Sequence, residues 1–310
     1  MPGIGIIANP HSKLNKRSPS EINRLRSIFG QKGIFCLSQT LAELDHILLD
    51  YKIKGIDIIG INGGDGSISR VISRTIAIYG DSPLPKFAIL GGGTMNLVAS
   101  ELKICGSPSA VLARLVGHLE AGTALKIERL ATLKINDIYG FLYADQSSTA
   151  ILEEFYRNKK SHFRAGWLTL RLVDSFFRQT AFIRSMIKPH DLNASVRPGG
   201  QIKTQALGCF AGTIAAFPMG LRLLPFARDR AHHFQITIID CPAEKLLWYL
   251  PLIMLQQKNG SATGRHSFCC QKAELGYNGE IHFTVDGEIY VQDKSSIVIE
   301  TGPELEFLQI

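Results

Sequence analysis

The fold of the first half of the chain is decided by one stretch: Ile56-Asp57-Ile58-Ile59-Gly60-Ile61-Asn62-Gly63-Gly64-Asp65-Gly66-Ser67. Its apolar first part, Ile56–Asn62, is typical of a buried strand, and the pattern that follows predicts a helix over Ser67–Tyr79. The glycines between them allow a tight turn whose N–H groups can face phosphate oxygens, and the helix start adds a positive dipole end. The turn therefore either binds phosphate or is a plain connection in which Asp65 caps the helix.

Asp65 is an unusual residue for a phosphate-binding turn, because its negative charge repels phosphate. Two uses explain it in such a place. The carboxylate can hold Mg²⁺ through water, or it can orient an attacking hydroxyl group.

Strands and helices alternate on both sides of this stretch. The expected strands are Ile4–Ala8, Ile34–Leu37 and Phe87–Leu90, and the expected helices are Ser20–Gln31, Leu41–Tyr51, Met95–Leu102 and Ser107–Glu120. Ser107-Pro108 supplies an N-cap and a first-turn proline, and Gly122 is a typical helix stop. The alternation predicts an α/β domain with a parallel sheet.

Two further turns follow strands of this predicted sheet. Gly91-Gly92-Gly93-Thr94-Met95-Asn96 comes after Phe87–Leu90, and Asn9-Pro10-His11-Ser12 comes after Ile4–Ala8. Because ligands bind at the carboxyl ends of strands in open α/β sheets, three such turns favour a shared nucleotide cleft over three unrelated connections.

After Gly122 the pattern changes to consecutive strands. They are expected at Ala124–Ile135, Ile138–Ala144, Ile202–Ala215, His233–Ile239, Gly264–Leu275, Glu280–Val285 and Ile297–Glu300. Strands without intervening helices predict an antiparallel β-sandwich, interrupted by helical stretches at Ser148–Ile187 and Ala243–Gln257. We place the domain boundary near residue 123, giving domains 1–123 and 124–310, with a C-terminal tail that can return to the first domain.

Composition excludes several classes of protein. The chain has 310 residues, a formal net charge of +7 and 45% hydrophobic residues, which excludes disordered, collagen-like and disulfide-scaffold proteins. The six cysteines show no CxxC spacing and no zinc-site cluster, so a reducing compartment is expected. The start of the chain lacks a leader pattern, and no apolar run reaches the roughly 20 residues of a membrane span. We expect a cytoplasmic protein.

Residues 157–188 are strongly basic, with eight Lys and Arg against the single acid Asp174 and many interleaved aromatic and aliphatic residues. This mixture suits a peripheral contact with the inner membrane surface. A helix packed on the sandwich with a cationic outer face is the alternative. Nucleic acid is not expected as a partner, because no recognisable binding module accompanies the charge.

The ordered motifs resemble those of the diacylglycerol kinase and sphingosine kinase type lipid kinases, which share a superfamily with the NAD kinases. The motifs are Asn9-Pro10-x-Ser12, Thr40, Gly63-Gly64-Asp65-Gly66-Ser67, Gly93-Thr94-x-Asn96 and Val285-Asp286-Gly287-Glu288. The resemblance implies a Rossmann-like α/β N-terminal domain, a C-terminal antiparallel β-sandwich and ATP bound between them. It also implies an ATP-dependent transfer of the γ-phosphoryl group to the hydroxyl of a diacylglycerol, sphingoid or ceramide-like lipid.

Carried over residue by residue, the resemblance implies ATP and Mg²⁺ as cofactors and a lipid as substrate. Glu288 would be the general base with Asp286 beside it, and Asp65 would be both catalytic and part of the metal site, with Glu128 as a second metal residue. The residues implied around the nucleotide are Asn9, Pro10, Ser12, Lys13, Thr40, Gly63, Gly64, Gly66, Ser67, Arg70, Gly93, Thr94 and Asn96.

The chain departs from the family pattern at Arg70 and Leu97, where the family usually has acidic residues. These departures leave open a nucleotide- or lipid-binding relative without turnover. A second alternative is a kinase of a soluble substrate such as NAD, because the GGDG loop is shared across the superfamily. Asp286-Gly287-Glu288 can also be a plain hairpin turn, because Asp-Gly is a common turn pair. A homodimer is compatible with the sequence.

Overall fold

The computed structural model describes residues 3–93, 96–146, 149–150, 188–215, 223–246, 248–249, 260–262 and 264–310. The chain divides into two compact units, which are described separately. Unit 1 comprises Met1–Thr132, Ile138–Gly140 and Pro303–Ile310, and unit 2 comprises Leu133–Asp137 and Phe141–Gly302. The division falls inside two long strands, β5 (Lys126–Ile135) and β17 (Ser296–Gln309), and not at residue 123, where the sequence pattern changes.

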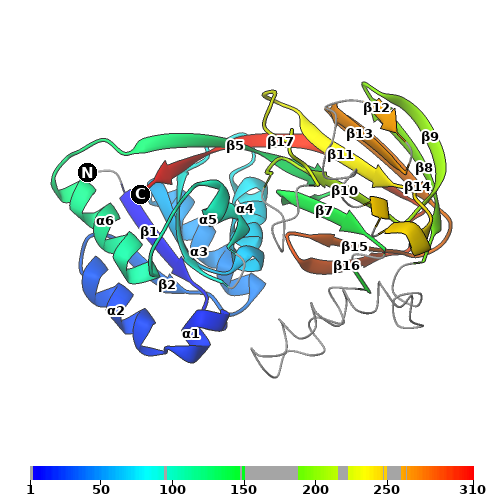
Figure 1. Ribbon diagram of the computed structural model, residues 1–310. Helices are drawn as coiled ribbons and strands as arrows, with labels where there is room; N and C mark the ends of the chain where they lie inside the picture. Colours follow the sequence, from blue (N-terminus) through cyan, green and yellow to red (C-terminus); the bar gives the residue numbers. More distant parts are fainter. Residues whose placement is uncertain are drawn as a thin grey trace. The chain divides into compact units, whose positions relative to one another are not determined.

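Unit 1 is built on a parallel sheet. Its strands run in the order β2-β1-β3-β4-β17, with β1 at Gly3–Ala8, β2 at Ile34–Leu37, β3 at Ile56–Gly63 and β4 at Lys86–Gly92 (Figure 1). Neighbouring strands in this order pair in parallel, including β4 and β17 through Phe87 and Phe307. Strands β1, β3 and β4 are almost entirely buried, which explains their continuous apolar runs, while the edge strand β2 is half-buried. The predicted parallel α/β sheet is confirmed.

Helices cover both faces of this sheet. They are α1 (Lys13–Arg17), α2 (Ser20–Phe29), α3 (Leu41–Ile53), α4 (Asp65–Tyr79), α5 (Leu97–Glu101) and α6 (Pro108–Glu120). Helices α2 and α6 pack on one face of β1 and β4, while α3 and α4 lie on the other (Figure 1). The Ser107 hydroxyl accepts the Ala110 N–H, and Gly122 has a φ of 62° just past the end of α6, so both predicted ends of this helix are confirmed.

Unit 2 is an antiparallel sandwich. One sheet has the strand order β12-β13-β11-β10-β7-β15-β16. The other sheet of the sandwich is formed by neighbouring strands in the order β17-β14-β8-β9. The hydroxyl groups of Tyr143 and Tyr277, one from each sheet, lie 2.9 Å apart in the interior. The strand bounds are β7 Leu142–Asp145, β8 His190–Arg197, β9 Gly200–Ala206, β10 Gly208–Gly212, β11 Phe234–Ile239, β12 Gly260–Ala262, β13 Arg265–Cys270, β14 Lys272–Tyr277, β15 Ile281–Val285 and β16 Glu288–Gln292. A short strand β6 (Ile138–Gly140) pairs with β5.

Several expected boundaries are wrong. The expected strand Ile202–Ala215 is two strands, β9 and β10, in different sheets, and Gly264–Leu275 is likewise β13 and β14. The apolar pattern continues across each corner, so it does not mark the change of sheet. The structure also adds α1, β8, β12 and β16, which the sequence did not indicate. The expected helix over Ser148–Ile187 and most of that over Ala243–Gln257 lie outside the described residues.

Candidate functional site

The carboxyl ends of β1, β3 and β4 are tied together by asparagine side chains. Asn62, the next-to-last residue of β3, is fully buried and donates its side-chain amide to the carbonyl oxygen of Gly91 (2.9 Å). Asn15 of α1 donates to Oδ1 of Asn62 (2.8 Å) and to the backbone oxygen of Asn9 (2.7 Å). The Asn9 N–H donates to the Asn62 carbonyl oxygen (2.9 Å). The turn after β1 is therefore fixed against the ends of two other strands.

The two glycine-rich turns are in direct contact. A Cβ atom on Gly93 would lie 2.6 Å from Cα of Gly64, and a Cβ on Gly64 would lie 3.2 Å from Cα of Gly93. Only glycine permits this approach of two backbones, because the first of these distances is shorter than any real carbon contact. Asn96 follows with a φ of 47° and accepts the Gly93 N–H at Oδ1 (3.0 Å), which fixes the second turn.

Asp65 is the first residue of α4 and is buried, with 8% of its surface exposed. Its Oδ1 accepts the N–H of Leu97 (2.7 Å), so the carboxylate holds the start of α5. Burial raises the pKa of Asp65 above its ordinary value, while hydrogen bonds from the backbone of Leu97, Val98 and Asn96 oppose that rise. Asp65 therefore caps the neighbouring helix α5, while the N-cap residue of its own helix α4 is Gly64.

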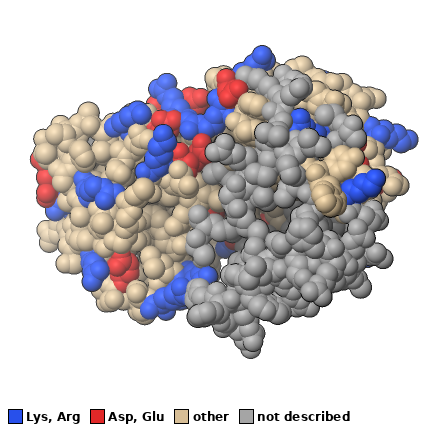
Figure 2. Space-filling view, in the orientation of Figure 1, with Lys and Arg blue, Asp and Glu red and all other residues tan. Residues whose placement is uncertain are grey.

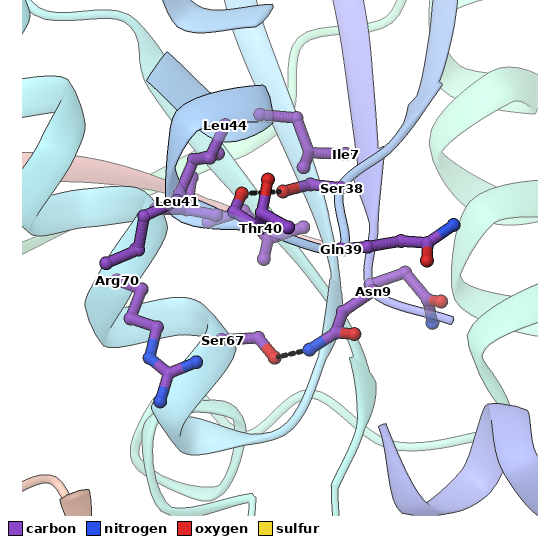
Figure 3. A pocket seen from close by; sticks show the side chains of 12 residues that line it. Ile7, Asn9, Ser38, Gln39, Thr40, Leu41, Leu44, Ser67 and Arg70 are labelled. Atoms are coloured by element: carbon purple, nitrogen blue, oxygen red, sulfur yellow. Dashed lines mark hydrogen bonds between the residues drawn. The ribbon is translucent and has the colours of Figure 1, made fainter. Parts of the chain in front are cut away.

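The first turn of α4 lies beside a pocket. Ser67 accepts the side-chain amide of Asn9 at Oγ (2.8 Å), and Arg70 extends from the next turn of α4 (Figure 3). Thr40 caps α3 by accepting the Glu43 N–H (3.2 Å) on the opposite wall. The pocket is lined by Ile7, Asn9, Ser38, Gln39, Thr40, Leu41, Leu44, Ile61, Asn62, Ser67, Arg70 and Val71. The pocket thus combines apolar side chains with amides and hydroxyls on both walls, a lining that suits a flat ligand with polar edges.

Basic side chains gather over α1, which follows the Asn9–Ser12 turn (Figure 2). Lys13, Lys16 and Arg17 are all exposed, and the helix contains no acidic residue. Ser12, at the start of the same helix, is 7% exposed, and its Oγ has no hydrogen-bond partner among the described residues. The turn therefore offers positive charge and one hydroxyl group that can still be bonded.

The other expected nucleotide residues also lie near these turns. Pro10 is half-buried in the turn after β1, Gly63 ends β3, and Gly66 lies in the first turn of α4. Thr94 lies outside the described residues. The structure thus brings together Asn9, Ser67 and Arg70 with Thr40 at one pocket, and places Gly64 against Gly93.

In unit 2, Asp286 and Gly287 form a two-residue hairpin turn between β15 and β16. Both have positive φ, 49° and 83°, and Val285 pairs with Glu288. The Asp286 carboxylate accepts the N–H groups of Phe141 (3.0 Å) and Leu142 (2.8 Å) and is 8% exposed. The turn is therefore a hairpin, but Asp286 is not solvated, since it fixes the turn to the start of β7. Glu288 follows it and is half-buried.

The expected metal residues do not form a cluster of ligands. Glu128 is half-buried on β5. Within the parts of the chain that the structure describes, no group of three or more His, Cys, Asp or Glu side chains could hold a metal ion. A magnesium ion would therefore rely on few protein carboxylates, which is common where phosphate oxygens supply the remaining ligands.

Asn15 and Asn62 are site residues that the sequence reasoning missed. Asn62 carries a usable signal, because a polar side chain at the end of an isoleucine-rich strand must find a buried partner. Asn15 carries no such signal, because a single asparagine in the basic segment Lys13–Arg17 is typical of an exposed helix surface.

Comparison with known proteins relates the first part of the chain to one family of kinases. The family model described as the diacylglycerol kinase catalytic domain matches residues 4–127. A solved diacylglycerol kinase structure from Bacillus anthracis str. Sterne has a TM-score of 0.67 at 11% identity, covering 99% of this chain and 96% of that one. Two further structures from that organism, provisionally described as diacylglycerol kinases, have TM-scores of 0.71 at 12% identity and the same coverage. At such identities these structures show the fold alone. No curated protein sequence matches the chain.

No helix among the described residues is long and apolar enough to span a membrane. The basic segment 157–188 lies outside the described residues apart from Lys188, so the membrane contact stays a prediction. Two further expectations also stay predictions: that nucleic acid is not a partner, and that the chain can form a homodimer.

Proposed function

We propose that this chain, which carries a domain of the diacylglycerol kinase catalytic family over residues 4–127, transfers the γ-phosphoryl group of ATP to the hydroxyl of a lipid. The single observation that carries the proposal is the backbone contact between Gly64 and Gly93 at the carboxyl edge of a parallel sheet. Such an edge is where nucleotides bind in open α/β folds. The lipid acceptor is proposed from the family and the overall likeness of the fold.

The residues of unit 1 fit a triphosphate. In α4 the Ser67 N–H already donates to the Gly64 oxygen (2.9 Å), so the two preceding N–H groups, those of Asp65 and Gly66, are the ones that can face phosphate oxygens at the positive end of this 15-residue helix. The unpartnered Ser12 hydroxyl and the exposed cations of α1 add a donor and positive charge. Thr40 and Gln39 supply polar groups on the opposite wall of the pocket, where a nucleoside would bind.

Asp65 fits a magnesium ion carried by the phosphates. The carboxylate accepts backbone N–H groups at the start of α5, and its two oxygens together offer about four acceptor positions, so it can also accept a water ligand of the metal. When bound, Mg²⁺ would neutralise charge on the β- and γ-phosphates. Arg70 can also neutralise part of the phosphate charge, since a guanidinium group near a phosphate is a strong charge-assisted hydrogen-bond donor. Glu128 stays a candidate for the same ion.

We assign the acceptor chemistry to Glu288. In the proposed reaction the lipid hydroxyl oxygen bonds to the γ-phosphorus, the bond from that phosphorus to the β–γ bridging oxygen breaks, and ADP leaves. The hydroxyl proton passes to the Glu288 carboxylate. Asp286 would position the turn that presents Glu288, because its own carboxylate is occupied by two backbone N–H groups.

The test is transfer of label from [γ-³²P]ATP to fractionated lipids presented in vesicles, with free NAD as a soluble acceptor in parallel. We expect the wild type to label one lipid class, and to do so only when Mg²⁺ is present. Label in NAD and in no lipid would replace the lipid acceptor by a soluble one. Tight Mg-ATP binding without label in any acceptor would make the chain a nucleotide-binding relative and end the proposal.

A further inference from the structure

We propose that Asn15 is a positioning residue for the nucleotide site, holding the Asn9–Ser12 turn at the ends of β3 and β4. The inference rests on the proposed function, and it concerns a residue outside the motifs that define the site. Asn15 touches no expected phosphate position, so its effect would pass through Asn9 and Asn62.

The contacts of Asn15 are specific. Its single side-chain nitrogen donates both hydrogens, one to the backbone oxygen of Asn9 (2.7 Å) and one to Oδ1 of Asn62 (2.8 Å). Asn62 passes the connection on by donating to the Gly91 carbonyl oxygen (2.9 Å). A chain of polar contacts therefore runs from α1 through β3 to Gly91 near the end of β4.

Burial makes these hydrogen bonds costly to lose. Asn15 is 2% exposed and Asn62 is fully buried, so water cannot replace a missing donor. The same burial is unexpected for packing alone, because Asn15 lies in a short helix whose other residues are mostly exposed. A buried amide that uses both of its donors on two different strand ends is a device for fixing a backbone.

The consequence for the nucleotide follows from Asn9. Its side chain donates to Ser67 Oγ (2.8 Å) and accepts the His11 N–H (2.8 Å), while its backbone oxygen accepts both Asn15 and the Ser12 N–H (3.2 Å). Asn9 and Ser67 both line the pocket. Without the Asn15 amide, the turn that carries Ser12 would therefore be held less firmly. Asn9 and Ser67, which line the pocket proposed for the nucleotide, would be positioned less precisely.

The test is a double-mutant cycle on Mg-ATP affinity with Asn15→Ala and Asn62→Ala. We expect each single variant to weaken ATP binding about tenfold relative to the wild type. The double variant should also lose only about tenfold, because both substitutions break the same chain of hydrogen bonds. Asn15→Asp keeps the size of the side chain but turns both donor contacts into acceptor–acceptor contacts. We expect it to bind ATP more weakly than Asn15→Ala, whereas a packing role predicts the reverse.

The matched control is Thr75→Val, which removes a fully buried hydrogen bond to the Val71 oxygen in the same unit but outside this network. It should lower the free energy of unfolding and leave ATP affinity unchanged. The lipid KM should stay unchanged in Asn15→Ala. Unchanged ATP affinity in Asn15→Ala, fully additive effects in the cycle, or an equal loss of ATP affinity in Thr75→Val would overturn the inference.

A readout without nucleotide separates this inference from the proposed function. Amide hydrogen exchange of His11 and Ser12 in the absence of ATP should speed up in Asn15→Ala and not in Thr75→Val. If the wild type binds no ATP, the proposed function fails and this exchange alone decides the role of Asn15 in holding the turn. Unchanged exchange at both amides would overturn that role.

Discussion

The Asp65 carboxylate has two roles, one in holding the local backbone and one in the proposed catalysis. It holds the Leu97 N–H within a buried turn, and burial raises its pKa, so the ionised form is disfavoured in the folded state. A carboxyl group whose pKa is raised on folding stabilises the protein most below its ordinary pKa, and that stability is lost as the pH rises through the raised value. Above the raised pKa the ionised Asp65 therefore costs stability, which is typical of a group kept for function.

Asp65→Asn separates these roles. The Asn side chain still offers Oδ1 to the Leu97 N–H, but it carries no charge, so the variant should gain stability relative to the wild type as the pH rises from acid to neutral. Turnover should fall by about a hundredfold or more, since metal and hydroxyl positioning are lost. Urea unfolding at several pH values and steady-state phosphorylation check both results. The control Asp57→Asn changes an exposed carboxylate of β3 and should leave turnover unchanged.

Glu288 and Asp286 belong to one hairpin but should respond differently. Glu288→Gln should lower kcat about a hundredfold with little change in ATP affinity, because the base acts on the acceptor. Asp286→Asn tolerates the positive φ and keeps an acceptor for the Phe141 and Leu142 amides, so its main effect should be about 1 kcal/mol of lost stability. A loss in Glu288→Gln that is confined to ATP affinity would contradict the assigned role.

At the scale of elements, the glycine turns depend on having no side chains where they meet. Gly93→Ala places a Cβ 2.6 Å from the Gly64 backbone, so one turn must move. We expect ATP affinity to fall about tenfold or more, measured by calorimetry. Gly117→Ala is the matched control, because Gly117 lies inside α6 with no atom within 4 Å of the new Cβ. It should add about 0.5–1 kcal/mol of stability and leave ATP affinity unchanged.

Local patterns predicted the elements of unit 1 well and the corners of unit 2 poorly. The bounds of β2 were predicted at Ile34–Leu37 because apolar residues and turn residues separate it clearly. Strand β8 was not predicted. Its apolar residues Leu192, Ala194 and Val196 alternate with polar ones, so the segment as a whole is too weakly hydrophobic to indicate a strand. The sequence also cannot show that Asn15 reaches Asn62, because that contact joins residues 47 positions apart.

At the scale of the whole molecule, unit 1 includes the end of the chain. Phe307 is fully buried and packs on Phe87 with ring centroids 5.7 Å apart, and Leu308 belongs to the core under α2 and α6. The first domain therefore cannot be cut cleanly at residue 123, because residues 1–123 lack a strand of their own sheet.

Phe307→Ala should reduce the free energy of unfolding by about 3–5 kcal/mol, the cost of emptying a buried aromatic site. Urea unfolding followed by circular dichroism measures it. Glu304→Ala changes an exposed residue of the same strand and should stay within about 0.5 kcal/mol of the wild type. Wild-type stability in Phe307→Ala would show that the end of β17 is dispensable to unit 1.

Amide hydrogen exchange with and without Mg-ATP measures most directly whether the three turns at the sheet edge hold one triphosphate. We predict that Mg-ATP slows exchange at Asn9–Ser12, Gly63–Ser67 and Gly91–Gly93 together in the wild type, and that it does not in Gly93→Ala. Slower exchange at none of the three turns, or only in unit 2, would contradict it.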